Sequence, residues 1–209
     1  MDKTKCVAAL FDFDGVVMDT ESQYSIFWNE VGKKYHPEYE EFGKIIKGQT
    51  LRQIYDRYFQ GMEHEQAEIT EGLNRFETEM RYEYVPGVAE FMQNLRAHGV
   101  KIAIVTSSNE KKMANVYAAH PELNDMAEMF QKSKPDPDCF LLGAKVFETL
   151  PANCVVFEDS FHGIQAGNAA GMPVVGLSTT NPAEAIQNQC ARVIPNFTCF
   201  TYEEMMNLL

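Results

Sequence analysis

The chain has 209 residues, of which 45% are hydrophobic and 23% charged, and these values are ordinary for a globular protein. This composition argues against a disordered or fibrous protein, and the length allows one good core with a second, smaller lobe. The formal net charge of −12 argues against nucleic acid or an anionic membrane as a partner, because an acidic surface repels both. An anionic substrate would be repelled as well, unless a bound cation or basic groups reverse the charge inside its site.

The first predicted element is a buried strand in residues 6–11, the apolar run CVAALF, which leads directly into Asp12. This run is too short for a signal sequence, and no other stretch of the sequence is long enough to cross a bilayer. The five cysteines are widely spaced and none has C-x-x-C spacing, so we expect inert thiols rather than a zinc site or disulfides. These features predict a soluble, cytoplasmic protein.

Residues 21–84 differ from the rest of the chain because they contain no strand-like run. Their aromatic and aliphatic residues recur at helical spacing, as Tyr24 and Trp28 do. We therefore predict an all-helical lobe inserted after the first strand, whose apolar stripes form its core. Pro86-Gly87 then marks the return of the chain to the sheet.

Three further runs have the near-continuous, β-branched hydrophobicity of strands that are buried on both faces. They are residues 101–105, 154–157 and 173–177. Helical patterns separate them, including one that Asn109 is expected to cap and that ends near Ala119. This alternation predicts an α/β fold with a doubly wound parallel sheet. We assign residues 1–17 and 86–209 to this core domain, and residues 18–85 to the helical insertion.

One predicted element is missing from the pattern. A doubly wound sheet should have another strand between His120 and Lys134, but the sequence there contains no apolar run of strand length. Either the loop is short in this protein or the sequence lacks residues at this point.

Polar side chains follow the predicted strands where each strand ends. They are Asp12, Asp14, Thr106, Glu158 and Asp159. Ligands bind at this carboxyl edge of an open α/β sheet, so we expect these residues to share one crevice. Asp12 and Asp14 are two residues apart on an extended segment and therefore point the same way. Carboxylates gathered in one crevice repel one another unless a cation binds, and Mg²⁺, which prefers oxygen ligands, is the natural occupant.

Each of these patterns has an ordinary structural explanation when it is taken alone. An Asp-x-Asp pair is often a solvated turn, the segment Thr106-Ser107-Ser108-Asn109 resembles a helix cap, and Lys134 resembles a surface lysine. Their joint order, with the acidic and hydroxyl residues each at the end of a strand, favours one shared site instead.

Four segments carry a resemblance to a known family, and together they span nearly the whole chain. They are Asp12-Phe13-Asp14-Gly15-Val16, Thr106-Ser107-Ser108, Ser133-Lys134-Pro135-Asp136-Pro137 and Phe157-Glu158-Asp159-Ser160. In sequence and order they resemble the four motifs of the haloacid dehalogenase (HAD) superfamily, in its β-phosphoglucomutase-like branch. The insertion at residues 18–85 is similar to the cap domain of that branch. The resemblance implies a Rossmann-like core and an enzyme that transfers the phosphoryl group of a small phosphorylated metabolite.

The resemblance also implies the role of each acidic residue. Asp12 would attack phosphorus and form an aspartyl-phosphate, which divides one difficult displacement into two easier ones. Asp14 would be the general acid for the leaving group and then the general base for the incoming water or alcohol. Mg²⁺ would be held by Asp12, Asp159 and the backbone carbonyl of Asp14, with Glu158 nearby through water.

By the same resemblance, Thr106, the backbone N–H of Ser107 and Lys134 would hold the transferring phosphoryl group. Fixed donors and charges of this kind stabilise the negative charge of the transition state. The cap would close over the site to exclude water, hinging near residues 19–20 and 85–86.

The acceptor of the phosphoryl group separates a phosphatase from a mutase. Sugar-phosphate mutases of this branch share a D-T-E-x-x-H pattern after the first motif, but here Asp19-Thr20-Glu21-Ser22-Gln23 is followed by Tyr24. This departure favours hydrolysis of a small phosphorylated metabolite, with a sugar phosphate as the preferred class, and leaves the mutase as the alternative. Tyr24, Lys47, Arg52 and Arg75 are the cap residues that we consider for substrate binding, although arginines on helices are usually solvated.

Two classes outside this family are also compatible with part of the pattern. Phospho-acceptor receiver domains combine acidic residues, a Ser or Thr and a Lys, but their phosphorylated Asp follows a middle strand and they lack a helical insertion. A non-catalytic binding protein is disfavoured, because every motif position keeps a competent residue. A monomer is the simplest expectation for a capped fold, and the sequence does not name the substrate.

Overall fold

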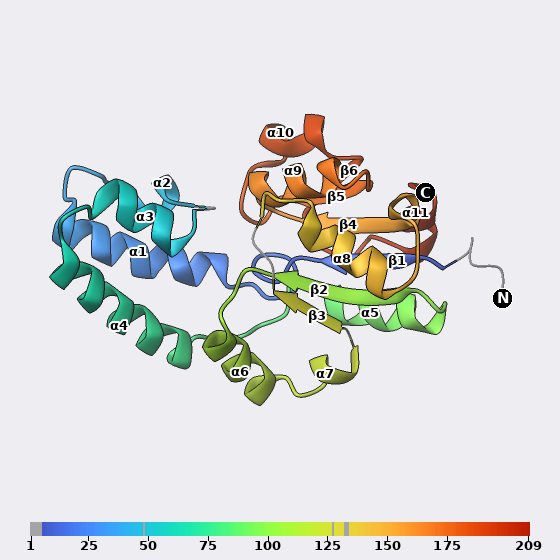
Figure 1. Ribbon diagram of the computed structural model, residues 1–209, viewed down its shortest axis with the longest axis horizontal. Helices are drawn as coiled ribbons and strands as arrows, with labels where there is room; N and C mark the ends of the chain where they lie inside the picture. The colour runs from blue at the N-terminus through green and yellow to red at the C-terminus, as the bar shows by residue number, and fades with distance from the viewer. Residues whose placement is uncertain (1–5, 48, 127, 132–133) are drawn as a thin grey trace. The chain divides into compact units, whose positions relative to one another are not determined.

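The computed structural model describes residues 6–47, 49–126, 128–131 and 134–209. The chain folds as two compact units (Figure 1). One unit comprises the residues up to Asp19 together with Tyr82–Leu209, and it contains the sheet. The other unit is Thr20–Arg81, and it is built from helices.

The sheet of the first unit has six strands in the order β3-β2-β1-β4-β5-β6, and every neighbouring pair is parallel. The strands are β1 Ala8–Phe11, β2 Lys101–Thr106, β3 Glu128–Gln131, β4 Cys154–Glu158, β5 Val174–Leu177 and β6 Arg192–Ile194. The chain starts in the interior of the sheet and winds outward in both directions. The doubly wound parallel sheet that the sequence predicts is therefore confirmed.

Helices cover both faces of this sheet, as the continuous hydrophobicity of the strands requires. They are α5 Val88–Ala97, α6 Glu110–Ala119, α7 Leu123–Met126, α8 Asp138–Val146, α9 Phe161–Ala169, α10 Ala183–Ile186 and α11 Tyr202–Met206. Its described residues also include short 3₁₀ turns at Pro151–Asn153 and Gln187–Gln189. Among the described residues, no helix is both long and apolar enough to cross a membrane.

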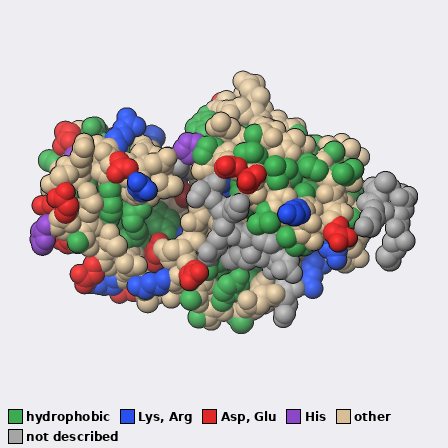
Figure 2. All heavy atoms as spheres, in the orientation of Figure 1, with side chains coloured by type: hydrophobic (Ala, Val, Ile, Leu, Met, Phe, Trp, Pro, Cys, Tyr) green, Lys and Arg blue, Asp and Glu red, His purple; other side chains and the backbone are tan. Residues whose placement is uncertain are grey.

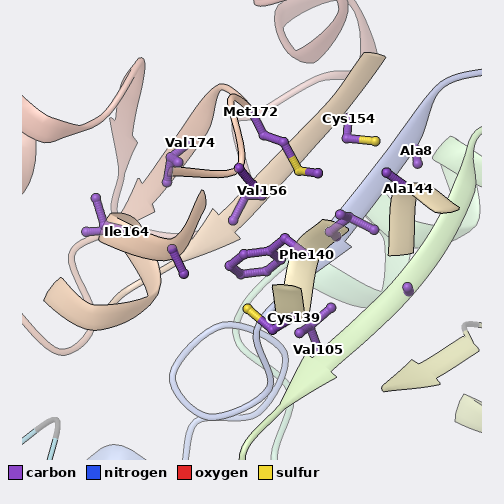
Figure 3. Packing of buried hydrophobic residues seen from close by; sticks show 14 of the residues in the cluster. Ala8, Val105, Cys139, Phe140, Ala144, Cys154, Val156, Ile164, Met172 and Val174 are labelled. Carbon is purple, nitrogen blue, oxygen red and sulfur yellow. The ribbon is translucent and has the colours of Figure 1, made fainter. Parts of the chain in front are cut away.

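One face of the sheet packs against α8 and α9. Its core includes Leu10, Val105 and Val156 from three strands, with Phe140 of α8 and Ile164 of α9 packed onto them. Figure 3 shows Phe140 lying between Val156 and Val105, the positions that a two-residue strand period brings to one face.

The opposite face of the sheet is aromatic. The Phe11 and Phe157 rings belong to directly paired residues of β1 and β4, and they stack with centroids 4.5 Å apart. Phe91 of α5 packs edge-on against both rings, and Phe197 and Phe200 near the C-terminus complete the cluster. Such offset and edge-on pairs add to the stabilisation that apolar burial provides.

Strand β3 occupies the region where the sequence pattern showed no strand, between His120 and Lys134. It pairs with β2 in parallel from Ala103↔Glu128 to Thr106↔Gln131, at the edge of the sheet. An edge strand has one neighbour and a short, partly polar sequence is common there, which explains why its sequence EMFQ gave no apolar run. The expected strand is therefore present.

The helical unit consists of α1 Glu21–Tyr35, α2 Phe42–Ile45, α3 Leu51–Tyr58 and α4 Glu63–Glu79. Its core contains Trp28, Phe42, Ile54, Phe59 and Ile69, with further aromatic residues packed around them. The predicted apolar stripes therefore form the core of this unit. Figure 2 shows acidic and basic side chains interspersed on the exposed surface of the same helices.

The two phenylalanines Phe140 and Phe161 allow a matched test of core packing. Phe140 is fully buried beneath the sheet, whereas Phe161 at the start of α9 is 46% exposed. We expect Phe140→Ala to lower the free energy of unfolding by about 3–5 kcal/mol, because it leaves a cavity in a close-packed core. Phe161→Ala should change it by less than about 1 kcal/mol. Urea denaturation measures both values, and equal losses would contradict this packing.

Candidate active site

Asp12 is the first residue after β1, an interior strand of the sheet. Its backbone N–H donates a hydrogen bond of 2.9 Å to the carbonyl of Phe157, which extends the β1–β4 pairing by one step. Asp12 is thereby fixed beside the end of β4, where Glu158 and Asp159 follow. The parallel register thus brings together carboxylates that are about 150 residues apart in the chain.

These three residues form a compact acidic cluster. Carboxylate oxygens of Asp12, Glu158 and Asp159 lie within 4.8 Å of one another. Glu158 and Asp159 are buried, and the Asp12 side chain is only 13% exposed. The Nζ of Lys134, in the segment between β3 and α8, donates hydrogen bonds to both Asp12 and Glu158. Ser133, the first residue of the third motif, lies outside the described residues.

Glu158 is held by the start of α9 as well as by Lys134. Its Oε2 accepts hydrogen bonds from the N–H groups of Asp159 and Ser160, both at 2.9 Å, and from the Ser160 hydroxyl at 3.0 Å. Gly163 in the first turn of α9 leaves room for this arrangement, because a Cβ there would lie 1.7 Å from Oε1 of Glu158. The two residues that lead into α9 therefore stabilise a buried carboxylate.

Asp159 is positioned by the loop that follows β5. The Thr179 and Thr180 hydroxyls donate to its Oδ2, and the Asn181 side chain donates to its backbone carbonyl at 2.8 Å. Thr179 also donates to the carbonyl of Gly15 at 2.6 Å, which connects this loop to the turn after Asp12. The sequence analysis missed these residues, although a polar Ser-Thr-Thr-Asn run directly after a predicted strand was an available signal.

Asp14 has different partners from Asp12. Its Oδ1 accepts a hydrogen bond of 2.5 Å from Nζ of Lys112, and its Oδ2 accepts one of 2.9 Å from the Ser108 hydroxyl. Thr106 is buried at the end of β2, and its hydroxyl oxygen accepts a hydrogen bond from the N–H of Ser108. Ser107 lies between them and is exposed. Lys112 was not among the predicted site residues, because a lysine in a helical pattern gives no signal of its own.

The pKa values of Asp12 and Lys134 are set by opposing effects of burial and of neighbouring charges. The pKa of Asp12 is raised to about 7: burial is the largest cause, the Lys134 ammonium opposes it, and the charge of Glu158 adds to it. Burial lowers the pKa of Lys134, but the carboxylates of Asp12 and Glu158 outweigh this and leave it above its usual value. Lys134 therefore stays charged, and it stabilises the ionised form of Asp12.

The donor set of this cluster fits a hard divalent cation. All the candidate ligands are carboxylate oxygens, the ligand type that Mg²⁺ prefers. Lys134 offsets one of the three negative charges, so a divalent cation would balance the other two. Glu158 is already bound by Lys134 and the start of α9, which makes Asp12 and Asp159 the more available ligands.

The four cap residues have partners within the helical unit. The Tyr24 hydroxyl donates to Glu77 at 2.9 Å, and Lys47 lies 3.8 Å from Glu21. Each arginine forms an ion pair with an acidic residue one turn along the same helix, Arg52 with Asp56 at 3.8 Å and Arg75 with Glu71 at 3.4 Å. Both arginines are mostly exposed, as is usual for arginines on helices. A role of these four residues in substrate binding stays a prediction.

Comparison with known proteins gives a consistent result. A sequence model of the haloacid dehalogenase-like hydrolase family matches residues 9–177. The chain is 30% identical to a CBBY-like protein of Arabidopsis thaliana, over 80% of this chain and 62% of that protein. It is 29% identical to hexitol phosphatase A of Escherichia coli, over 83% of this chain and 84% of that one. It is 27% identical to β-phosphoglucomutase of Bacillus subtilis, over 84% of each chain.

The fold is shared with solved structures. A HAD hydrolase, family IA, variant 3, from Entamoeba histolytica superposes with a TM-score of 0.83 at 24% identity, over 97% of this chain and 98% of that one. At this identity the likeness concerns the fold, and it includes the helical insertion as well as the sheet.

Gly163→Ala tests whether the start of α9 holds Glu158. The added Cβ would collide with a carboxylate that four hydrogen bonds fix in place, so we expect a loss of about 1–3 kcal/mol in the free energy of unfolding. Gly72→Ala is the matched control. It also lies inside a helix, but its Cβ would be 3.7 Å from Phe27, an ordinary contact. That variant should gain about 0.5–1 kcal/mol from helix propensity. Equal effects in urea denaturation would contradict the assigned role of Gly163.

Metal binding should depend on pH in a defined direction. The pKa of Asp12 is raised from 3.8 to about 7 in the folded chain. The protonated carboxyl therefore favours the folded state, and this stability is lost as pH rises through 7 and the group ionises. A cation that binds the ionised carboxylate reverses this loss, whereas at pH 6 it must first displace a proton. We therefore expect Mg²⁺ to raise the melting temperature more at pH 8 than at pH 6.

Differential scanning fluorimetry with MgCl₂ measures this difference, and Asp159→Asn should abolish most of the Mg²⁺ effect at both pH values. A shift of equal size at pH 6 and pH 8 would mean that Asp12 does not bind the ion.

Proposed function

This chain belongs to the haloacid dehalogenase-like hydrolase family, and on that basis we propose that it is a Mg²⁺-dependent phosphatase of a small phosphorylated metabolite. A sugar phosphate is the favoured substrate class, because one relative is a hexitol phosphatase and another is a β-phosphoglucomutase. The reaction proceeds through a phosphoryl group that Asp12 carries transiently.

The observation that supports this proposal best is the contact of Lys134 with Asp12 inside the acidic cluster. The ammonium favours the ionised form of a largely buried aspartate, as a nucleophile requires, and it would also stabilise negative charge on a phosphoryl group bound to Asp12. A merely structural ion pair would not require a second and third carboxylate within 4.8 Å.

In the first half of the reaction, a carboxylate oxygen of Asp12 attacks phosphorus and the ester P–O bond breaks. Asp14 donates its proton to the leaving oxygen, so the alcohol departs and Asp12 carries an acyl phosphate. The Lys134 ammonium stabilises the charge on the transferring group, together with Thr106 and the Ser107 backbone N–H.

In the second half, a water molecule attacks the phosphorus of the acyl phosphate and gives its proton to Asp14. The bond between phosphorus and the Asp12 oxygen breaks, which releases inorganic phosphate and restores both aspartates. Mg²⁺, held by Asp12, Asp159 and the Asp14 carbonyl, would neutralise negative charge on the phosphoryl oxygens. The Thr179 and Thr180 hydroxyls orient Asp159 for this purpose.

Water is the favoured acceptor because of the residue at position 24. Where mutases of this branch resemble one another in a histidine, this chain has Tyr24, whose hydroxyl donates to Glu77 within the helical unit. A tyrosine bound to a carboxylate is a poor replacement for a histidine that has to exchange protons. A β-phosphoglucomutase-type reaction is the alternative, since such an enzyme is among the relatives.

The decisive experiment is phosphate release from a panel of sugar phosphates and other phosphate esters, with and without Mg²⁺. We expect Mg²⁺-dependent release that falls by more than about 10³-fold in Asp12→Asn, because the nucleophile is lost. Asp138→Asn is the matched control, since Asp138 is exposed on α8 and lies outside the proposed machinery. It should keep nearly the full rate.

Two results would overturn the proposal. Release that persists in Asp12→Asn would exclude this residue as the nucleophile. Conversion of a hexose 1-phosphate to its 6-isomer with a bisphosphate activator, without release of phosphate, would establish the mutase instead.

A further inference from the structure

Lys112 on α6 has a contact that the proposed mechanism does not yet use. We propose that Lys112 is a positioning residue that holds Asp14 as the general base for the water that hydrolyses the phosphorylated enzyme. This inference rests on the proposed function and adds a residue to it. Its basis is the 2.5 Å contact between Nζ of Lys112 and Oδ1 of Asp14.

The location of Lys112 is unfavourable for a lysine unless it serves a purpose. The residue is 2% exposed, and lysine is among the side chains least often buried. It lies in the first turn of α6, where its backbone N–H donates to the capping Asn109 and where the helix dipole disfavours a positive charge. Its neighbour Lys111 is exposed, as a lysine in a helix usually is. The partner that offsets these costs is Asp14, and the Phe13 ring adds a contact at 5.6 Å.

The two oxygens of Asp14 are held from two directions. Lys112 donates to Oδ1, and the Ser108 hydroxyl donates to Oδ2 at 2.9 Å. Ser108 is itself fixed, because its N–H donates to the hydroxyl of buried Thr106 at the end of β2. Because each oxygen of the Asp14 carboxylate accepts a hydrogen bond from a different side chain, the plane of the carboxylate is fixed. The Asp14 carboxylate is therefore held in one orientation.

Fixing this orientation matters most in the second half-reaction. The attacking water is a small molecule with no other part through which the enzyme can orient it, so its alignment depends on the base that binds it. Without Lys112, the Asp14 carboxylate loses one anchor and the favourable charge beside its ionised form. Hydrolysis of the acyl phosphate should slow, whereas transfer to Asp12 from a good leaving group, which needs no proton, should slow much less.

The test is Lys112→Met assayed with p-nitrophenyl phosphate and Mg²⁺. We expect kcat to fall by about 10–100-fold, the range seen when a supporting residue of a reactive group is removed. KM should fall with it, so that kcat/KM changes by less than about 3-fold. Rapid-quench measurements should show a burst of p-nitrophenol, and intact-mass spectrometry should show one added phosphoryl group on most of the enzyme. Lys111→Met is the matched control and should show neither change.

Ser108→Ala provides a second, independent variant. It removes the donor to the other oxygen of Asp14 and should give the same split between kcat and kcat/KM, with a smaller burst. If Lys112→Met does not fold, as judged by circular dichroism, then Ser108→Ala and Lys112→Arg decide the question. Arginine keeps the positive charge and should recover part of kcat.

Three outcomes would overturn the inference. Equal losses in kcat and kcat/KM without phosphorylated enzyme would show that Lys112 supports the fold or the capture of the phosphoryl group. Behaviour identical to that of Lys111→Met would show no role in the reaction. A phosphorylated enzyme that does not accumulate in either Lys112→Met or Ser108→Ala would exclude the base step. Failure of the proposed function is separate, because Asp12→Asn would then retain turnover whatever the Lys112 variants do.

Discussion

The contact of Lys134 with Asp12 and Glu158 is the interaction on which the acidic cluster depends. Burying carboxylates is costly, and bringing three of them within 4.8 Å is costlier still, because like charges repel one another. The ammonium of Lys134 offsets part of this cost, and hydrogen bonds that Asp159 and the capping residue Ser160 donate to Glu158 offset more. The position of this carboxylate also requires glycine at residue 163, because the Cβ of any larger residue would collide with Glu158.

Each of the two aspartates of the first motif is in contact with its own largely buried lysine. Lys134 contacts Asp12, and Lys112 contacts Asp14. The aspartates are two residues apart and have the same chemistry, so the different roles proposed for them would have to come from their surroundings. One lies in the acidic cluster where a cation fits, and the other lies against a lysine and a serine that orient it. This separation is what the proposed mechanism requires of a loop that supplies both a nucleophile and a proton-transfer group.

The helical unit contributes a stable scaffold with a charged surface. Its aromatic core is continuous around Trp28 and Phe42, and the basic residues considered for substrate binding already pair with acidic neighbours. A substrate that recruits Arg75 would have to replace its ion pair with Glu71, which costs little to break at an exposed surface.

The sequence by itself determined the parallel sheet, the helical insertion and the four motifs. Buried strands such as β1 and β4 must be continuously apolar, and the polar residues that end them must meet at one edge. It did not reveal β3, because an edge strand with one neighbour need not be apolar. It also did not reveal Lys112, Thr179 or Thr180, because their roles depend on contacts with residues about 20 to 160 positions away. Only the tertiary structure, which brings α6 and the loop after β5 to the ends of β1 and β4, decided which lysine holds which aspartate.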